Sequence, residues 1–245
     1  MNSTGIDVRH ILDFSLPELA RKTALIFQDR AYTYQDLSNE VSRLACGLLQ
    51  TSSPGDLLAV WLPNCPELLC LYLACLKTGI VPMPVHQGMT WPEVHHILAA
   101  TQTTTLITSQ KTLDEWPMTF ATTRLQQVYV LELNQRSEFF HPYDELTSTW
   151  HDFTVSHLSE DSPAFVLHTS GSERYAKGVM LSYRNLNHIL NFRLAYTRLT
   201  LESTAVVASC LTQSVGLHQS LALLAAGGQI VLLESYDLEP LVAAI

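Results

Sequence analysis

The sequence is short of basic residues, and this shortage limits the partners it can have. Lys and Arg number 14 against 23 Asp and Glu, so the formal net charge at pH 7 is −9. Nucleic-acid backbones and anionic membranes are bound by clusters of basic side chains. We therefore expect no nucleic-acid partner, and a phosphate-bearing ligand would have to be held by a local site.

The sequence also lacks a secretion signal and a long uninterrupted hydrophobic run. Residues 1–15 do not contain the basic start and apolar segment of a signal peptide. The longest apolar stretch, residues 66–85, is interrupted by Lys77, Gly79 and Pro82 before it reaches membrane-spanning length. We expect no membrane span and a cytoplasmic location.

Neither cysteine nor histidine spacing forms a metal-binding motif. The cysteines are odd in number and lack zinc-site spacing, so we expect buried free thiols in a reducing cytosol. His95 and His96 are adjacent and would face different directions on a helix. His188 and His218 fall on two other expected helices, so we assign no metal to the histidines. The cysteines are Cys46, Cys65, Cys70, Cys75 and Cys210.

Three common catalytic motifs are absent. A Walker-type loop needs G-x-x-x-x-G-K-[ST]. Counted from Gly171, the spacing reaches Lys177, but Ala176 replaces the second glycine and Gly178 replaces the hydroxyl residue. The sequence contains no G-x-S-x-G elbow and no H-E-x-x-H helix. A P-loop ATPase or kinase, an elbow-type serine hydrolase and an H-E-x-x-H metalloprotease are therefore excluded.

What the sequence does contain is a regular alternation of helical and extended patterns. With 245 residues, 47% of them apolar, the chain can bury a core as one large domain or two small ones. Such alternation predicts an α/β fold whose parallel-rich sheets are covered by helices on both faces. The expected helices are 36–49, 66–78, 91–100, 183–199 and 217–226, with the start of another at residue 237. The expected strands are 57–63, 80–85, 103–109, 127–133, 164–170, 204–210 and 229–235.

Two of these helices carry clear local signals. Pro66 suits a first helical turn and Gly79 a helix end, and the helix between them is apolar nearly all round, which predicts burial between layers. Thr90 and Glu93 have the spacing of a capping box at the next helix. Residues 134–160 show no clean periodicity and are expected to form a connecting segment.

One loop has the composition of a phosphate site. In FVLHTSGSERYAKGVMLSYRNL, residues 165–186, an apolar strand stops at hydroxylated residues, a glycine and a lysine. We expect the loop between this strand and a helix, at the carboxyl end of a strand in a parallel sheet, where such folds bind ligands. Hydroxyls, backbone N–H groups turned by glycine and a lysine charge together make a phosphate cradle. The alternative is a simple polar turn with Ser172 or Glu173 as local caps.

The segment HTSGSERYAKGVMLSYRNL resembles the phosphate-binding signature of the adenylate-forming enzymes, Y-T-S-G-[ST]-T-G-x-P-K-G-V. This superfamily contains acyl-CoA synthetases, peptide-synthetase adenylation domains and luciferases. Segments 22–49, 54–85 and 216–245 are similar to further blocks of the family, in the same order and spacing. The positions in register with the signature are Thr169, Ser170, Gly171, Ser172, Lys177, Gly178 and Val179.

The resemblance implies ATP-dependent activation of a small carboxylic acid, fatty or otherwise. The loop would hold the β- and γ-phosphates while the carboxylate attacks the α-phosphate. The acyl-adenylate would then react with the thiol of CoA or of a carrier protein. The implied nucleotide-binding residues are Thr169, Ser170, Gly171, Ser172, Glu173, Arg174 and Lys177. The implied substrate-binding residues are Gln213 and Gly216.

The resemblance further implies that the chain is an incomplete large N-terminal domain of the adenylate-forming fold. Residues 1–160 would form its first part and residues 161–245 its second part, which carries the loop. The magnesium ligand, the ribose-binding aspartate, the hinge and the C-terminal domain with the catalytic lysine are expected beyond residue 245. We therefore assign no catalytic residue to this chain and expect that it does not complete adenylation alone.

Three positions differ from the family pattern. Arg174 stands where relatives have a small residue, Ala176 replaces the usual proline, and Gln213 stands where relatives often have histidine. The last expected helix also stops after about two turns, as a truncated product would. These features leave open an alternative function, a non-catalytic relative that binds a nucleotide or acts as a scaffold.

Overall fold

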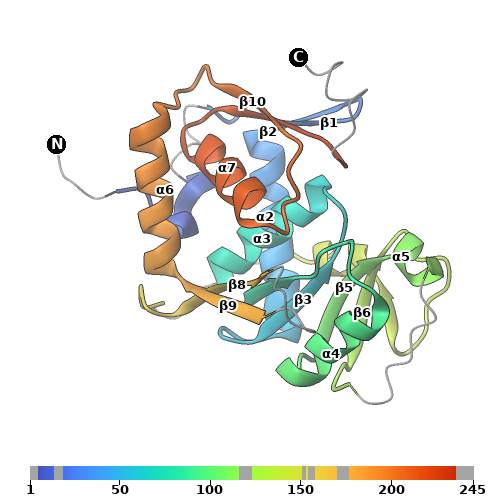
Figure 1. Ribbon diagram of the computed structural model, residues 1–245. Helices are drawn as coiled ribbons and strands as arrows, with labels where there is room; N and C mark the ends of the chain where they lie inside the picture. Colours follow the sequence, from blue (N-terminus) through green and yellow to red (C-terminus); the bar gives the residue numbers. More distant parts are fainter. Residues whose placement is uncertain are drawn as a thin grey trace.

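The computed structural model describes residues 5–13, 19–115, 123–150, 153, 158–169 and 177–235. These residues form three sheets with helices packed between and around them (Figure 1). The five-stranded sheet has the order β4 (Val81–Pro84), β3 (Leu57–Trp61), β5 (Thr105–Ser109), β6 (Gln127–Leu131) and β7 (Phe140–Pro142). The four-stranded sheet has the order β10 (Thr204–Val207), β11 (Gln229–Leu232), β1 (Thr23–Phe27) and β2 (Arg30–Thr33). The two-stranded sheet consists of β8 (Pro163–Thr169) and β9 (Lys177–Ser182).

The helices begin and end where local chemistry places them. The Glu93 carboxylate accepts a 2.7 Å bond from the Thr90 N–H, which confirms the predicted capping box. Gly79 adopts the left-handed conformation at φ 81° and ends α3, as predicted. The helices are α2 (Tyr34–Thr51), α3 (Pro66–Thr78), α4 (Trp91–Thr101), α5 (Gln110–Glu115), α6 (Tyr183–Thr197) and α7 (Ser214–Ala225), with 3-10 turns η1 (Val8–His10) and η2 (Tyr143–Thr147).

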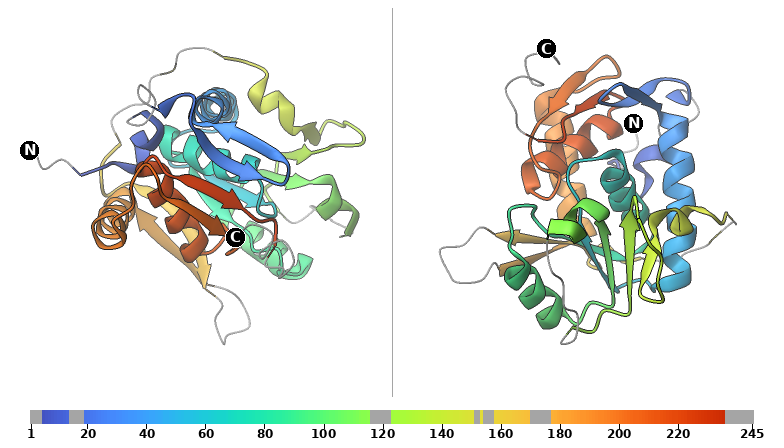
Figure 2. Two further views of the ribbon diagram at one scale, coloured as in Figure 1. Left: turned by 90° about the horizontal axis from the view of Figure 1, so that it is seen from above. Right: turned by 90° about the vertical axis from the view of Figure 1, so that its right-hand side faces the viewer.

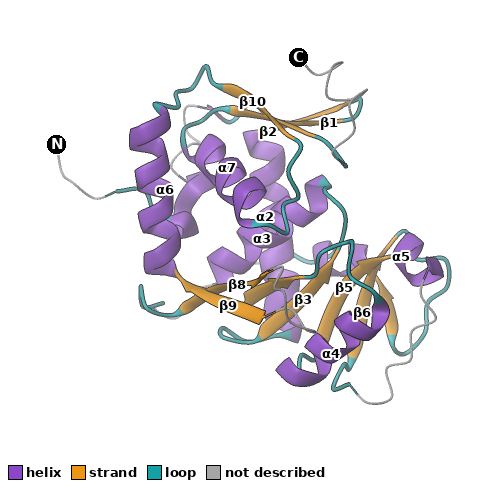
Figure 3. Ribbon diagram, in the orientation of Figure 1, coloured by secondary structure: helices purple, strands orange, loops and turns teal. Residues whose placement is uncertain are grey.

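The five-stranded sheet confirms the predicted parallel sheet with helices on both faces. All of its strand pairs are parallel. Alternate residues of β3 point to opposite faces, so Leu58 and Val60 join the core with α2 and α3, while Ala59 and Trp61 join the core with α4 (Figure 3). Eleven of the thirteen α3 residues are buried, which confirms that this helix lies between layers.

The four-stranded sheet joins the beginning of the chain to its last described strand. β11 pairs in parallel with both β10 and β1, whereas β1 pairs with β2 as an antiparallel hairpin (Figure 2, left). The sequence analysis did not assign β1 and β2 as strands. The hydroxyl of Tyr34, directly after this hairpin, donates a 2.7 Å bond to the Gly228 carbonyl. One hydrophobic cluster therefore includes residues from Val8 to Leu232.

The expectation that the phosphate loop lies between a strand of a parallel sheet and a helix was wrong. β8 and β9 form an antiparallel hairpin, and α6 begins only after β9. β8 lies beside β4, but the N–H groups of Val81 and Val85 bond toward β3. The intervening Pro82 and Pro84 have no N–H to offer β8. The hairpin consequently forms its own sheet, and its loop still follows the carboxyl end of β8.

Several smaller boundaries also differ from the predictions. Residues 134–160 are not only a connection, because they contain β7 and η2, whose lengths of three and five residues are too short to show a period. α7 begins at Ser214, three residues before the predicted start, because Gln213 takes the N-cap position. The helix expected from residue 237 lies outside the described residues.

The structure bears on two further predictions. Four of the five cysteines are buried free thiols and Cys210 is partly exposed; burial raises the pKa of Cys65 and Cys75 well above the usual range. Among the described residues, no helix combines the length and apolar character needed to cross a membrane.

Candidate functional site

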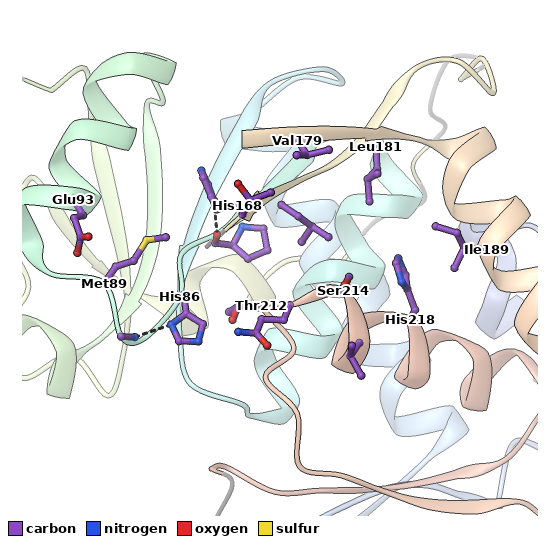
Figure 4. A pocket seen from close by; sticks show the side chains of 16 residues that line it. His86, Met89, Glu93, His168, Val179, Leu181, Ile189, Thr212, Ser214 and His218 are labelled. Atoms are coloured by element: carbon purple, nitrogen blue, oxygen red, sulfur yellow. Dashed lines mark hydrogen bonds between the residues drawn. The ribbon is translucent and has the colours of Figure 1, made fainter. Parts of the chain in front are cut away.

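A cavity of about 730 Å³ lies between the β8–β9 hairpin and the beginning of α7 (Figure 4). Its walls also include Ile189 of α6 and the segment from Pro84 to Glu93, which connects β4 to α4. The sides are mostly apolar, with Leu167, Val179 and Leu181 contributed by the hairpin. The cavity thus combines parts of the chain that are far apart in sequence.

The hairpin brings the two ends of the predicted phosphate loop together. Thr169 is directly opposite Lys177 in the strand register, and the Thr169 hydroxyl donates to the Lys177 carbonyl at 3.5 Å. Thr169 lines the cavity. Lys177 lies at the same end of the hairpin. The other predicted nucleotide-binding residues, Ser170, Gly171, Ser172, Glu173 and Arg174, lie outside the described residues.

Gln213 lines the cavity from the opposite side. It is the N-cap of α7, with extended backbone angles, and its side chain makes no capping hydrogen bond. The first N–H groups of a helix have no partner within the helix, and the helix dipole makes this end positive. The wall near Gln213 therefore favours a negatively charged group of a ligand.

Gly216, the other predicted substrate-binding residue, lies behind this wall and does not line the cavity. A β-carbon at Gly216 would come within 2.5 Å of the Cys210 carbonyl oxygen and 2.7 Å of the Ser209 carbonyl oxygen. Glycine is needed because the first turn of α7 packs directly on the loop before it. Gly216 allows α7 to begin this close to the loop, and its role toward a substrate stays a prediction.

Asn64, in the loop between β3 and α3, holds the segment that leads into α7. Its side-chain oxygen accepts a 2.8 Å bond from the Leu211 N–H. Its amide nitrogen donates to the carbonyls of Ser209 at 3.2 Å and Leu233 at 2.9 Å. The sequence analysis missed Asn64, because its partners lie more than a hundred positions away.

Three histidines line the cavity, and each has a different environment. Nδ1 of His168 lies 3.1 Å from the Pro84 carbonyl, to which it donates; burial nevertheless lowers the pKa of this ring. Nδ1 of His86 accepts a 3.0 Å bond from the Gly88 N–H. Burial, together with the charge of Arg193, lowers the pKa of His218 to about 4.

His218 is a cavity residue that the sequence analysis treated as ordinary. It is 9% exposed, and its Nε2 has no hydrogen-bond partner among the described residues. Thr212, which also lines the cavity, has a buried hydroxyl without a partner in the same part of the structure. The only local signal was a histidine on an apolar helix, which is more often a core residue.

The charges around the cavity are few. Among the described residues that line the cavity, Glu93 is the only Asp, Glu, Lys or Arg. Within the described ranges, no group of three or more His, Cys, Asp and Glu side chains is placed to hold a metal ion. The mostly apolar walls suit a largely apolar ligand, and the positive end of α7 at Gln213 suits an anionic group on that ligand.

Comparisons with known proteins identify relatives of the chain. Residues 15–245 match the sequence model of the AMP-binding enzyme family. The chain is 30% identical over 225 residues to a feruloyl-CoA synthase from Amycolatopsis sp, covering 91% of this chain and 43% of that protein. It is 30% identical over 182 residues to a crotonobetaine/carnitine–CoA ligase from Proteus mirabilis, covering 68% and 34%.

The fold is also that of solved ligases. A crystal structure of a long-chain-fatty-acid-CoA ligase from Archaeoglobus fulgidus superimposes with a TM-score of 0.87 at 20% identity, over 98% of this chain and 49% of that one. The chain therefore spans less than half the length of these relatives.

Proposed function

This chain belongs to the AMP-binding enzyme family, and on that premise we propose that its protein activates a carboxylic acid with ATP and transfers the acyl group to a thiol. The carboxylate oxygen attacks the α-phosphorus of ATP, the bond to the β-phosphate oxygen breaks, and pyrophosphate leaves. A thiolate then attacks the acyl carbon and AMP leaves. The observation that supports this proposal is the cavity joining Thr169, at one end of the phosphate loop, to Gln213 on α7.

The chain's own residues would contribute mainly electrostatic stabilisation. Lys177 begins β9 beside the loop, where its charge can offset the charge that develops on the leaving pyrophosphate. The positive end of α7 at Gln213 would orient the carboxylate toward the loop. Both groups are held by secondary structure, so they need little rearrangement during the reaction.

The acid, the acceptor and the metal belong to the same proposal. The relatives are named for feruloyl and for crotonobetaine or carnitine substrates, and another is a dimodular nonribosomal peptide synthase. We therefore propose a small carboxylic acid as substrate and CoA or a carrier-protein thiol as acceptor. Mg²⁺ would accompany ATP, but the described residues offer no ligand set for it, and we assign it no step.

We further propose that residues 1–245 bind ATP without completing adenylation, and that the division at residue 160 separates two parts of one domain. This part of the proposal is supported by length, because the chain covers 43% and 34% of the two relatives above.

Two measurements test the proposed function. The first is ATP binding to the 245-residue chain by calorimetry, comparing wild type with Lys177→Ala and with Lys111→Ala, an exposed lysine on α5. The second is acid-dependent ATP–pyrophosphate exchange by the protein as its gene encodes it, over a panel of acids. We expect Lys177→Ala alone to weaken binding and abolish exchange. Absence of both binding and exchange in the wild type would refute the proposal.

A second candidate function is a nucleotide-binding relative without chemistry. It is supported by Gln213, which cannot carry the charge of the histidine that relatives often have at this place. ATP binding that is sensitive to Lys177→Ala, combined with no exchange for any acid in the panel, would favour this candidate.

A further inference from the structure

His218 occupies the end of the cavity away from the phosphate loop. β9 runs from Lys177, beside the loop, to Ser182, directly before α6, and Leu181 lies near this second end. Figure 4 shows the His218 ring rising from α7 toward β9, between Ser214 and Ile189. A ligand with its carboxylate near Thr169 and Gln213 would therefore extend along Val179 and Leu181 toward His218.

The His218 side chain is buried with one ring nitrogen lacking a hydrogen-bond partner among the described residues. It is 9% exposed, and its Nε2 has no partner among the described residues. Buried polar groups in proteins are nearly always hydrogen-bonded, and exceptions call for a missing partner such as a ligand. The hydroxyls of Thr212 and Ser214 also line the cavity, but neither is hydrogen-bonded to Nε2, so a molecule bound in the cavity can supply that partner.

The chemistry of the ring indicates which ligand group would fit. A neutral imidazole has one N–H donor and one bare acceptor nitrogen. A hydroxyl can donate and accept, so it matches the ring in either tautomer. A second carboxylate would find no Lys or Arg among the described residues that line the cavity. Arg193 lies near His218, but it lines a separate hollow with Thr197 and Gln219.

We propose that this cavity selects a carboxylic acid with an apolar body and a hydroxyl group remote from the carboxylate, and that His218 is the residue that binds this hydroxyl. The inference rests on the proposed acid-activating function and names its substrate class. Plain alkyl or aryl acids would leave His218 unpaired, whereas dicarboxylic acids would place a second charge beside described lining residues that include no Lys or Arg. His218 acts here as a specificity-determining residue.

The test uses pairs of acids that differ by the one hydroxyl. Binding to the full 245-residue chain would be measured by calorimetry for 8-hydroxyoctanoate against octanoate and for 4-hydroxycinnamate against cinnamate, with octanedioate as the charged alternative. We expect the hydroxylated member of at least one pair to bind about tenfold to a hundredfold more tightly, since sites built to pair a hydroxyl discriminate strongly against its loss. Octanedioate should bind more weakly than 8-hydroxyoctanoate.

His218→Leu supplies the decisive comparison, because it keeps an apolar side chain in the wall and removes the polar nitrogens. We expect it to remove the hydroxyl preference while binding of the plain acid is retained or improved. His188→Leu, on α6 and outside the cavity lining, should keep the preference. A preference that survives in His218→Leu, or plain acids that bind wild type as well as hydroxylated ones, would overturn this inference and leave the proposed function standing. No binding of any acid would overturn this inference, and absence of exchange as well would overturn the proposed function.

Discussion

Asn64→Ala should destabilise the protein more than its single polar side chain suggests. Asn64 is 4% exposed and makes three hydrogen bonds to backbone groups of the Ser209–Leu211 segment and Leu233. At about 1 kcal/mol per bond, the loss is about 3 kcal/mol of unfolding free energy. For a chain of this size, that change corresponds to a fall of roughly 6–12 °C in Tm.

Urea denaturation followed by circular dichroism measures the free energy, and acid binding by calorimetry measures the consequence for the cavity. Because Asn64 holds the segment before Gln213, the affinity for acids should fall with the stability. Asn64→Asp should be destabilised at least as much, because its carboxylate would face the two carbonyls that now accept from the amide. Asn39→Ala, on the exposed side of α2, should stay within about 0.5 kcal/mol of wild type. If Asn64→Ala also stayed within that range, the claim that Asn64 organises this wall would be wrong.

Three other changes test separate parts of the structure. Gly216→Ala should lower the unfolding free energy, measured by urea denaturation, by about 1–3 kcal/mol despite the better helix propensity of alanine. The reason is that the new β-carbon would lie 2.5 Å from the Cys210 carbonyl oxygen. Unchanged stability would mean that the loop before α7 can move away at little energetic cost. Gly79→Ala should cost about 1 kcal/mol, since Gly79 ends α3 at a φ of 81°; no loss would contradict the assigned conformation. The pKa of His218 is about 4 in the folded protein, against about 6.5 when unfolded, so the unfolded state binds the proton first as pH falls. The unfolding free energy of wild type should therefore fall by about 3 kcal/mol relative to that of His218→Gln between pH 6.5 and 4, and should not change relative to it above that range. Parallel pH profiles of the two proteins would show that the ring is not buried as a neutral group.

The sequence predicted the elements whose signals are local. α3 and α4 carry their own start and stop residues, and Thr90 and Glu93 form the predicted box. The separation of β8 from the five-stranded sheet was missed because it depends on Pro82 and Pro84 of β4. No pattern within residues 163–182 reports that dependence.

The candidate site likewise contains residues that a local sequence signal predicted and residues that it did not. Thr169, Lys177 and Gln213 were predicted because they stand in a motif or beside one, and the structure brings Thr169 and Gln213 to one cavity. Asn64 and His218 were not recognised, since their meaning depends on contacts between remote segments. Asparagine and histidine side chains occur in many structural roles, and only the folded cavity shows which role Asn64 and His218 have.

The pairing of β1 with β11 has a consequence for how the chain folds during synthesis. Leu25 lies opposite Ile230, so the partner of β1 leaves the ribosome about 200 residues later, which takes roughly 10–40 s at cellular rates. During that interval the β1–β2 hairpin has an open edge, and open edges recruit foreign strands. The nascent chain therefore passes through a period in which a chaperone, or a neighbouring copy, can compete for the position that β11 finally occupies.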